Sequence, residues 1–161
     1  MTTIATPHGP FSVLVDSQGT VLASGWTTDL DSLLALVHPT LRDDVGGDAA
    51  VALAAVDAYY AGDSSAPARV PVRQHSGEFR MHAWDVLRRV APGAPVTYTE
   101  FAALADRPAA TRAAAGACAM NAAALFVPCH RVVRSDGTLG GFRYGLDIKQ
   151  ALLEIERTRA A

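Results

Sequence analysis

The chain has 161 residues, half of them hydrophobic, and 14 Lys+Arg stand against 16 Asp+Glu for a net charge of −2. This composition supports a hydrophobic core, and the absence of an apolar run of about 18 residues argues against a membrane span. Two cysteines do not make a disulfide framework, and the N-terminus lacks the basic and apolar pattern of a signal peptide. We therefore expect a soluble, reduced, cytoplasmic protein without a membrane partner.

Charge is distributed unevenly along the chain. Residues 1–72 carry two arginines against eight aspartates, whereas residues 73–161 carry twelve basic side chains against eight acidic ones. The positive excess of the second half indicates contact with an anion. A chance distribution of surface charge explains the same numbers equally well, so charge alone does not decide the matter.

The first half predicts a small α/β domain over residues 1–70. β-rich runs and a glycine-containing turn indicate a hairpin, and two segments with apolar helical spacing follow it. The predicted strands are Thr3–Ala5, Phe11–Val15 and Val21–Gly25, and the predicted helices lie within 29–39 and 47–63, the second ending at Gly62. A Pro/Ser-rich linker, "SSAPARVPVR", then leads to a second domain over residues 71–161.

The second domain is predicted to be mainly helical. Its first helix is expected to start at Ser76 as N-cap and to end at Pro92-Gly93, with an apolar face made of Phe79, Ala83, Val86 and Leu87. The last helix, "LDIKQALLEIERTRA", should bury Ile148, Leu152 and Ile155.

Between them, residues 97–108 and 109–121 predict two short helices joined by a tight turn, with Thr97 or Thr99 capping the first. This pattern is typical of a helix-turn-helix, although small-residue helices also occur as ordinary packing helices. The fold class is therefore α+β: a small α/β N-terminal domain and a mainly helical C-terminal domain containing a helix-turn-helix.

A thiol, an imidazole and a guanidinium follow one another in "PCHR", residues 128–131, after the apolar stretch "AAALFV". A nucleophilic thiol needs a base that lowers its pKa. We expect an extended segment here, in which neighbouring side chains point in opposite directions. His130 would then act on Cys129 through one water, with Glu154 or Glu156 behind it. Helical periodicity does not choose between these two glutamates.

Other uses of this cluster are weaker. A buried cysteine is often an inert small hydrophobe. One Cys-His pair lacks the second pair of ligands that a zinc site needs, and no local signature of a cysteine protease is present. We expect no metal and no cofactor. Arg131 is expected to pair internally, without a chemical role.

The segment "PCHRVV" resembles the active-site motif of the O6-alkylguanine-DNA alkyltransferases. The resemblance covers roughly residues 76–158, and "TPHGPFSVLVDSQGTVLASGW" is more weakly similar to the small N-terminal domain of these proteins. It implies DNA repair by direct, irreversible transfer of an alkyl group from O6-alkylguanine in duplex DNA to Cys129, with base flipping. The implied partner is double-stranded DNA, bound by a monomer.

The resemblance also implies site residues, position by position. The implied catalytic residues are Cys129, His130, Glu156, Asn121 and Tyr98. The implied DNA contacts are Arg112, which would enter the base stack, together with Tyr98, Thr97 and Ala113. The implied substrate pocket consists of Val132, Phe142, Arg143, Gly141 and Pro128.

Three positions depart from the family pattern. Ala122 stands where a proline is usual, Phe142 replaces the pocket tyrosine, and Arg143 replaces a small hydroxyl residue. These departures bear on substrate range. They also leave an alternative open, a non-catalytic protein that recognises alkylated bases, although such relatives carry another residue in place of the cysteine. A regulatory role would need a further metal-binding cysteine domain.

Overall fold

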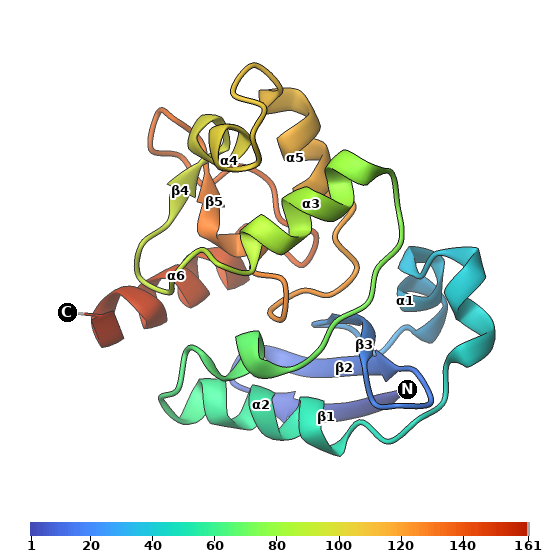
Figure 1. Cartoon of the computed structure of the whole chain (residues 1–161). Helices are drawn as coiled ribbons and strands as arrows, with labels where there is room; N and C mark the ends of the chain where they lie inside the picture. The colour runs from blue at the N-terminus through green and yellow to red at the C-terminus, as the bar shows by residue number, and fades with distance from the viewer. Residues whose placement is uncertain (161) are drawn as a thin grey trace. The chain divides into compact units, whose positions relative to one another are not determined.

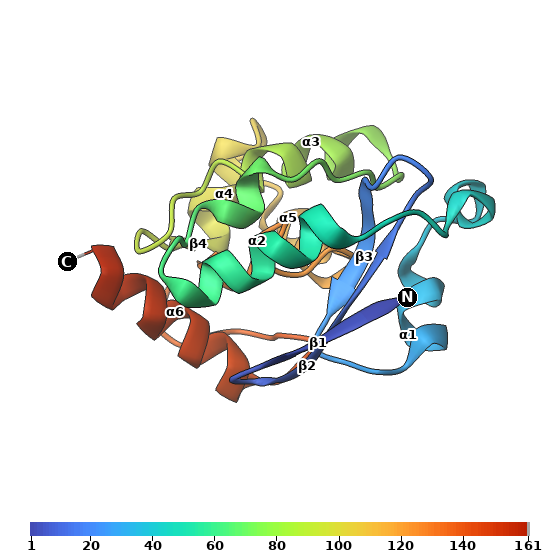
Figure 2. The same ribbon diagram turned by 90° about the horizontal axis from the view of Figure 1, so that it is seen from below.

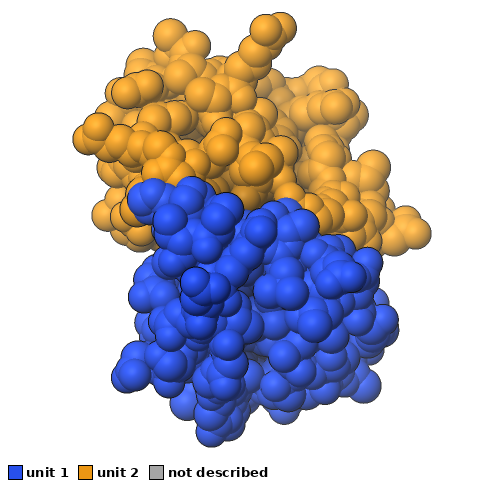
Figure 3. Space-filling view, turned by 90° about the vertical axis from the view of Figure 1, so that its right-hand side faces the viewer, with its two compact units in different colours: residues 1–75, 122–127 blue, residues 76–121, 128–161 orange. Residues whose placement is uncertain are grey.

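The computed structural model describes residues 1–160, which form two compact units (Figure 3). Unit 1 consists of residues 1–75 and 122–127, and unit 2 consists of residues 76–121 and the chain from residue 128 onward. The predicted division at residue 70/71 differs from this in two respects. Unit 1 continues to His75, and a six-residue segment from far along the sequence also belongs to it.

Unit 1 is built on an antiparallel sheet in the order β1-β2-β3 (Figure 1). The strands are β1 (Thr2–Thr6), β2 (Gly9–Val15) and β3 (Val21–Gly25). α1 (Leu30–Leu36) packs against β3, and α2 (Ala50–Ala61) packs against β1. Two short 3-10 helices, η1 (Pro39–Asp44) and η2 (Ala66–Arg69), complete the unit. All three predicted strands and both predicted helices are therefore present.

The segment 122–127 is buried throughout and completes the core of unit 1. Ser24 on β3 donates its backbone N–H to the Ala122 carbonyl at 2.9 Å and its hydroxyl to the Ala124 carbonyl at 2.8 Å. The prediction of one extended stretch from here into "PCHR" is wrong. Leu125 has a positive φ of 74°, and the Val127 N–H donates to the Ala123 carbonyl, so the chain turns back on itself.

Unit 2 is mainly helical (Figures 1 and 2), and it carries a short parallel pair of strands, labelled β4 and β5 in Figure 1. Its helices are α3 (Glu78–Leu87), α4 (Tyr98–Leu104), α5 (Thr111–Ala119) and α6 (Leu146–Ala160). β4 (Val96–Thr97) pairs with β5 (Val132–Val133), which follows η3 (Cys129–Arg131). α3, α4 and α5 pack on one another, and α6 packs on η3. The fold class is α+β, as predicted.

Two details of the helices differ from the predictions. α3 has Gly77 rather than Ser76 at its N-cap, and it ends at Leu87, five residues before Pro92. On α6, Leu152 is buried as expected, but the other fully buried positions are Lys149 and Glu156. Apolar spacing misplaces this face because two charged side chains find partners inside the unit. No helix within residues 1–160 is long and apolar enough to cross a membrane.

Candidate functional site

Every predicted site residue lies in unit 2. β4 and β5 pair in parallel, with Val96 opposite Val132 and Thr97 opposite Val133. Thr97 then caps α4 by accepting the Glu100 N–H at 3.1 Å. Because α4 starts at the end of β4, its first residue, Tyr98, lies beside the strand that follows the "PCHR" segment.

Cys129 is half-buried as a residue, and Asn121 is buried. Burial raises the pKa of Cys129, while a hydrogen bond with the Asn121 side chain and the charges of Lys149 and Arg143 act to lower it. Asn121 comes two residues after the last residue of α5, so the end of that helix places its amide at the thiol. Burial outweighs these effects, so the pKa of Cys129 stays above its ordinary value and the thiol is protonated at neutral pH.

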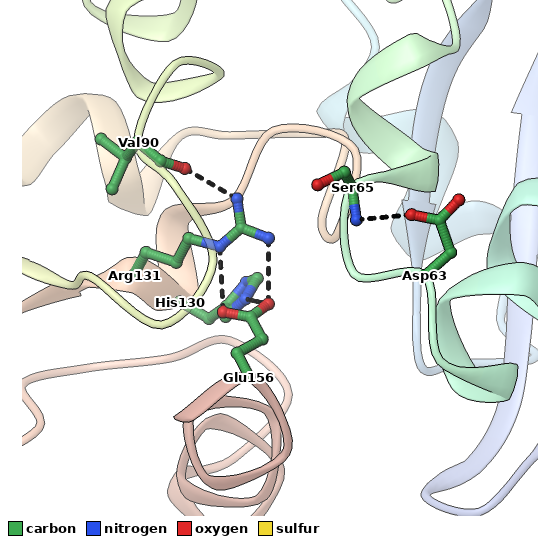
Figure 4. A network of polar contacts seen from close by, with 6 residues as sticks. All are labelled: Asp63, Ser65, Val90, His130, Arg131 and Glu156. Atoms are coloured by element: carbon green, nitrogen blue, oxygen red, sulfur yellow. Dashed lines mark hydrogen bonds and ion pairs between the residues drawn. The ribbon is translucent and has the colours of Figure 1, made fainter. Parts of the chain in front are cut away.

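His130 is fully buried, and its Nε2 lies 2.7 Å from Oε1 of Glu156 (Figure 4). The other ring nitrogen, Nδ1, is buried without a hydrogen-bond partner among residues 1–160. When Nε2 carries the proton and donates a hydrogen bond to Glu156, Nδ1 is the deprotonated nitrogen and has a free lone pair. An imidazole held in this way can accept a proton from a nearby group.

Arg131 shares the same carboxylate, as Figure 4 shows. Its Nε donates to Oε2 of Glu156 at 3.0 Å, its Nη2 donates to Oε1 at 3.0 Å, and its Nη1 donates to the Val90 carbonyl at 2.8 Å. This two-pronged contact fixes the carboxylate and supplies a permanent positive charge beside it. Arg131 thus pairs internally, as expected, and its partner is the carboxylate that holds His130.

These contacts set the protonation states of the pair. Burial favours the neutral form of Glu156, but the hydrogen bonds and charges of His130 and Arg131 outweigh it and lower its pKa to about 2. Burial lowers the pKa of His130 below the ordinary 6.5, against the opposing effect of Glu156. At neutral pH the site therefore holds an ionised Glu156 and a neutral His130.

The structure separates the two candidate glutamates. Glu156 is buried and bonded to His130, whereas Glu154 is exposed and paired with Arg157 on the same helix. The expectation that Cys129 and His130 lie on a strand is wrong, because Cys129–Arg131 form the 3-10 helix η3. The tighter turn lets His130 and the neighbouring Arg131 both reach Glu156.

The predicted pocket residues have different environments. Val132 and Pro128 are buried, whereas Gly141 and Arg143 are exposed and Phe142 is half-buried. Arg143 donates Nη1 to the Asn121 carbonyl at 2.9 Å and Nη2 to the Ala119 carbonyl. It thereby ties the 139–145 loop to the carbonyl end of α5, a contact that sequence reasoning did not anticipate.

The predicted DNA contacts gather at the start of α5. Arg112 and Ala113 are exposed there, while Ala114 and Ala117 on the same helix are buried. Small buried residues let α5 pack closely on α3, where Trp84 donates its indole N–H to the Ala117 carbonyl at 2.9 Å. The outer face of α5 therefore presents Arg112 to solvent.

Sequence reasoning missed Lys149. This side chain is fully buried on α6, and its Nζ donates to the Val132 carbonyl at 2.7 Å and to the Gly141 carbonyl at 3.3 Å. The pattern of apolar residues hides it, because a buried lysine breaks the rule on which such patterns rest. A signal did exist in the composition: Lys149 is the one lysine of the chain, whose other thirteen basic residues are arginines.

The fold and the site define a small helical unit in which a carboxylate-held histidine directly follows a cysteine in the chain, an arrangement typical of proteins with a cysteine nucleophile. The family model for the 6-O-methylguanine DNA methyltransferase, DNA-binding domain, matches residues 78–158. The methylated-DNA–protein-cysteine methyltransferase of Shigella flexneri is 30% identical over 158 residues, covering 95% of this chain and 92% of that protein. The chain belongs to the 6-O-methylguanine DNA methyltransferase family.

Other relatives match over part of their length. The bifunctional transcriptional activator/DNA repair enzyme Ada of Escherichia coli is 42% identical over 90 residues, 56% of this chain but 25% of Ada. The chain likewise spans 58% of the Haemophilus influenzae methyltransferase, to which it is 34% identical. Among solved structures, the Mycobacterium tuberculosis OGT in complex with DNA has a TM-score of 0.78 at 27% identity, over 98% of this chain and 92% of that one.

Proposed function

We propose that this protein repairs DNA by direct, irreversible transfer of an alkyl group from O6 of guanine in duplex DNA to its own Cys129. The observation that carries the proposal is the buried His130, which follows Cys129 on η3, is bonded to Glu156 through one nitrogen and has no hydrogen-bond partner within residues 1–160 at the other. The names of the matched family and of several relatives, methylated-DNA–protein-cysteine methyltransferases, support the same reaction.

The residues present account for the chemistry. Glu156 accepts a hydrogen bond from Nε2–H of His130, which leaves Nδ1 free to act as the base. Nδ1 takes the Cys129 proton through one water, and Cys129 becomes a thiolate. The thiolate displaces guanine from the alkyl carbon: the S–C bond forms as the C–O bond breaks. The departing guanine recovers a proton, for which Tyr98 is the proposed donor. The thioether product does not revert, so each protein molecule acts once.

DNA reaches the site through unit 2 in this proposal. Unit 2 carries eleven basic against eight acidic side chains, whereas unit 1 carries three arginines against eight aspartates. We assign α4 and α5 to a helix-turn-helix that binds DNA. Tyr98, Thr97 and Ala113 would then lie beside the DNA backbone. Arg112, exposed on α5, fills the gap left by the flipped base.

The flipped base is proposed to enter a pocket lined by β5 and by the 139–145 loop. The Val132 carbonyl would read the guanine amino group, and Phe142 would stack on the ring. Pro128, Gly141 and Arg143 complete the assigned pocket. Contacts would be mostly to the DNA backbone, because lesions arise in any sequence, and affinity should fall with salt. We further propose that the protein acts as a monomer in the cytoplasm, where thiols stay reduced.

The test is the intact mass of the protein after incubation with duplex DNA that carries O6-methylguanine. Wild type should gain about one methylene, in one-to-one stoichiometry, as should Cys118→Ser, the matched control that removes the other thiol. Cys129→Ser should gain nothing. Lesion-selective binding of the wild type without any gain in mass would overturn the proposal and favour a damage-recognition protein.

A further inference from the structure

Both polar atoms of the peptide group between Asn121 and Ala122 bind side chains. Its carbonyl oxygen, from Asn121, accepts a hydrogen bond from Nη1 of Arg143 at 2.9 Å. Its N–H, from Ala122, donates to Oε1 of Gln74 at 2.9 Å. We call these two contacts the peptide clamp. Asn121 is the last residue of unit 2 before the segment 122–127, so the clamp fixes the peptide at which the chain enters that segment.

The backbone that carries Gln74 is itself anchored to β3. Val21 on that strand donates its N–H to the Pro71 carbonyl at 3.0 Å, and its own carbonyl accepts the Arg73 N–H at 2.9 Å. The Arg73 guanidinium also pairs with the buried Asp16 carboxylate at 3.4 Å. A side chain that starts from a fixed backbone loses less entropy when it makes a hydrogen bond. Gln74 is therefore well placed to hold its partner.

The residues that follow the clamped peptide are anchored to the same strand. Ser24 on β3 donates its N–H to the Ala122 carbonyl and pairs in parallel with Ala123. Gln74 thus reaches from one segment on β3 to another. Alanine at position 122 makes this contact possible, because the proline that is usual there has no N–H to donate. The clamp supplies by a hydrogen bond the restraint that a proline ring would supply covalently.

The clamp acts on the thiol through the side chain of Asn121. This side chain hydrogen-bonds with Cys129 and acts to lower the pKa of the thiol, as do the charges of Lys149 and Arg143. The Asn121 N–H donates to the Cys118 carbonyl at 3.3 Å, so the Asn121 backbone is held on both sides of its side chain. A buried amide on a fixed backbone has few orientations left, and here one of them places it at the sulfur.

We propose that Gln74 is a positioning residue for alkyl transfer: together with Arg143 it clamps the Asn121–Ala122 peptide and so holds the Asn121 amide against the Cys129 sulfur. Gln74 acts through Asn121 and not on the thiol itself. This inference rests on the proposed function for its biological meaning. Its physical content, an effect of Gln74 on Asn121 and on Cys129, can be measured without DNA.

The first measurement uses the fact that Asn121 is the one asparagine of the chain. A 15N-asparagine label therefore gives a single side-chain amide signal. Gln74→Met keeps the length of the side chain but removes the amide oxygen; it should move this signal and speed the exchange of the amide hydrogens by about fivefold, the effect of losing one hydrogen bond. Gln74→Glu keeps an oxygen at the same length and should leave the signal and its exchange close to those of the wild type.

The second measurement follows the rate of Cys129 alkylation by iodoacetamide against pH, in a Cys118→Ser background so that one thiol reports. Gln74→Met should move the midpoint upward by about half a pH unit, which is about a threefold slower reaction below the midpoint. Gln18→Met is the matched control, because it makes the same substitution at an exposed glutamine in the turn between β2 and β3. It should change neither measurement.

Val56→Ala separates a loss of the clamp from a general loss of stability. Val56 is fully buried on α2 in unit 1, so this variant should lower the melting temperature without moving the Asn121 signal. An unmoved Asn121 signal or an unmoved midpoint in Gln74→Met, or an equal effect of Val56→Ala or Gln18→Met, would refute the proposal. A wild-type chain that accepts no methyl from DNA would contradict the proposed function alone, since both measurements would still report on Gln74.

Discussion

At the residue scale, the Glu156 carboxylate has two partners with different consequences. Its contact with His130 orients an imidazole, and its contact with Arg131 balances a buried charge. Removing the negative charge therefore affects more than the proposed base. It also leaves the Arg131 guanidinium, which donates to the Val90 carbonyl as well, buried without its carboxylate.

Glu156→Gln should destabilise the protein by about 3–5 kcal/mol, the usual cost of removing one partner from a buried ion pair. Urea denaturation would measure this change. Glu154→Gln is the control on the same helix, where an exposed carboxylate pairs with exposed Arg157, and it should leave stability nearly unchanged. Equal effects of the two substitutions would contradict the assignment of Glu156 as the buried partner.

Stability should fall with acidification in two stages. His130 has a folded-state pKa below its ordinary 6.5, so the unfolded chain binds the proton first and stability begins to fall as the pH drops below that value. Glu156, with a folded-state pKa of about 2 against an ordinary 4.5, contributes stability above 4.5 that is lost as the pH falls toward 2.

Free energies of unfolding measured from about pH 8 down to about pH 2 would show these stages. His130→Gln removes the titrating imidazole and should flatten the upper stage while leaving the lower one. A wild-type stability that stays constant between these limits would count against a buried, neutral His130.

At the scale of elements, the 139–145 loop is held at several points. Arg143 bonds it to the end of α5, and Lys149 on α6 bonds to Gly141. Gly140 has a φ of +74°, and a Cβ added to it would lie 2.9 Å from the Tyr98 hydroxyl oxygen. The loop therefore approaches α4 at a position where only glycine avoids both strain and contact.

Gly140→Ala should consequently destabilise the protein more than Gly137→Ala does. Gly137 has a similar φ of +86°, but an added Cβ would meet nothing within 4 Å. Both variants share the left-handed strain of about 1–2 kcal/mol, so their difference isolates the collision with Tyr98. Thermal denaturation of the two variants would measure it, and equal losses would show that the loop does not pack on Tyr98.

At the scale of the whole molecule, the chain crosses between the two units more than once. It leaves unit 2 after Asn121, contributes residues 122–127 to unit 1, and re-enters unit 2 at Pro128. Asn121 at the thiol and Pro128 before Cys129 are thus covalently joined to a segment held by Ser24 on β3. The proposed site is flanked by a segment whose packing partners lie in unit 1.

A fragment of residues 76–161 should therefore fold poorly, although it contains every proposed site residue. Its residues 122–127 would lose the partners that bury Leu125, Phe126 and Val127, at roughly 2 kcal/mol for each large side chain. Denaturant titration and gel filtration of the fragment beside the full chain would test this. A monomeric fragment with a cooperative transition like that of the full chain would contradict it.

The sequence by itself determined the parts that depend on local chemistry. The β1–β3 strands follow from β-rich runs and a turn glycine, the start of α4 from a threonine cap at Thr97 or Thr99, and the proposed reactive segment from "PCHR" with its family resemblance. Each of these signals is complete within a few neighbouring residues. For that reason they can be recognised without knowing what the rest of the chain does.

Residue spacing could not show which charges lie inside: the family resemblance implied Glu156, and the tertiary structure alone revealed Lys149. Helical spacing left Glu154 and Glu156 equivalent and placed Lys149 outside the core, because it assumes that buried residues are apolar. Glu156 is buried because Arg131 and His130, 25 and 26 residues away, meet it, and Lys149 is buried because it reaches Val132, 17 residues away. Burial of a charge depends on partners that only folding brings together.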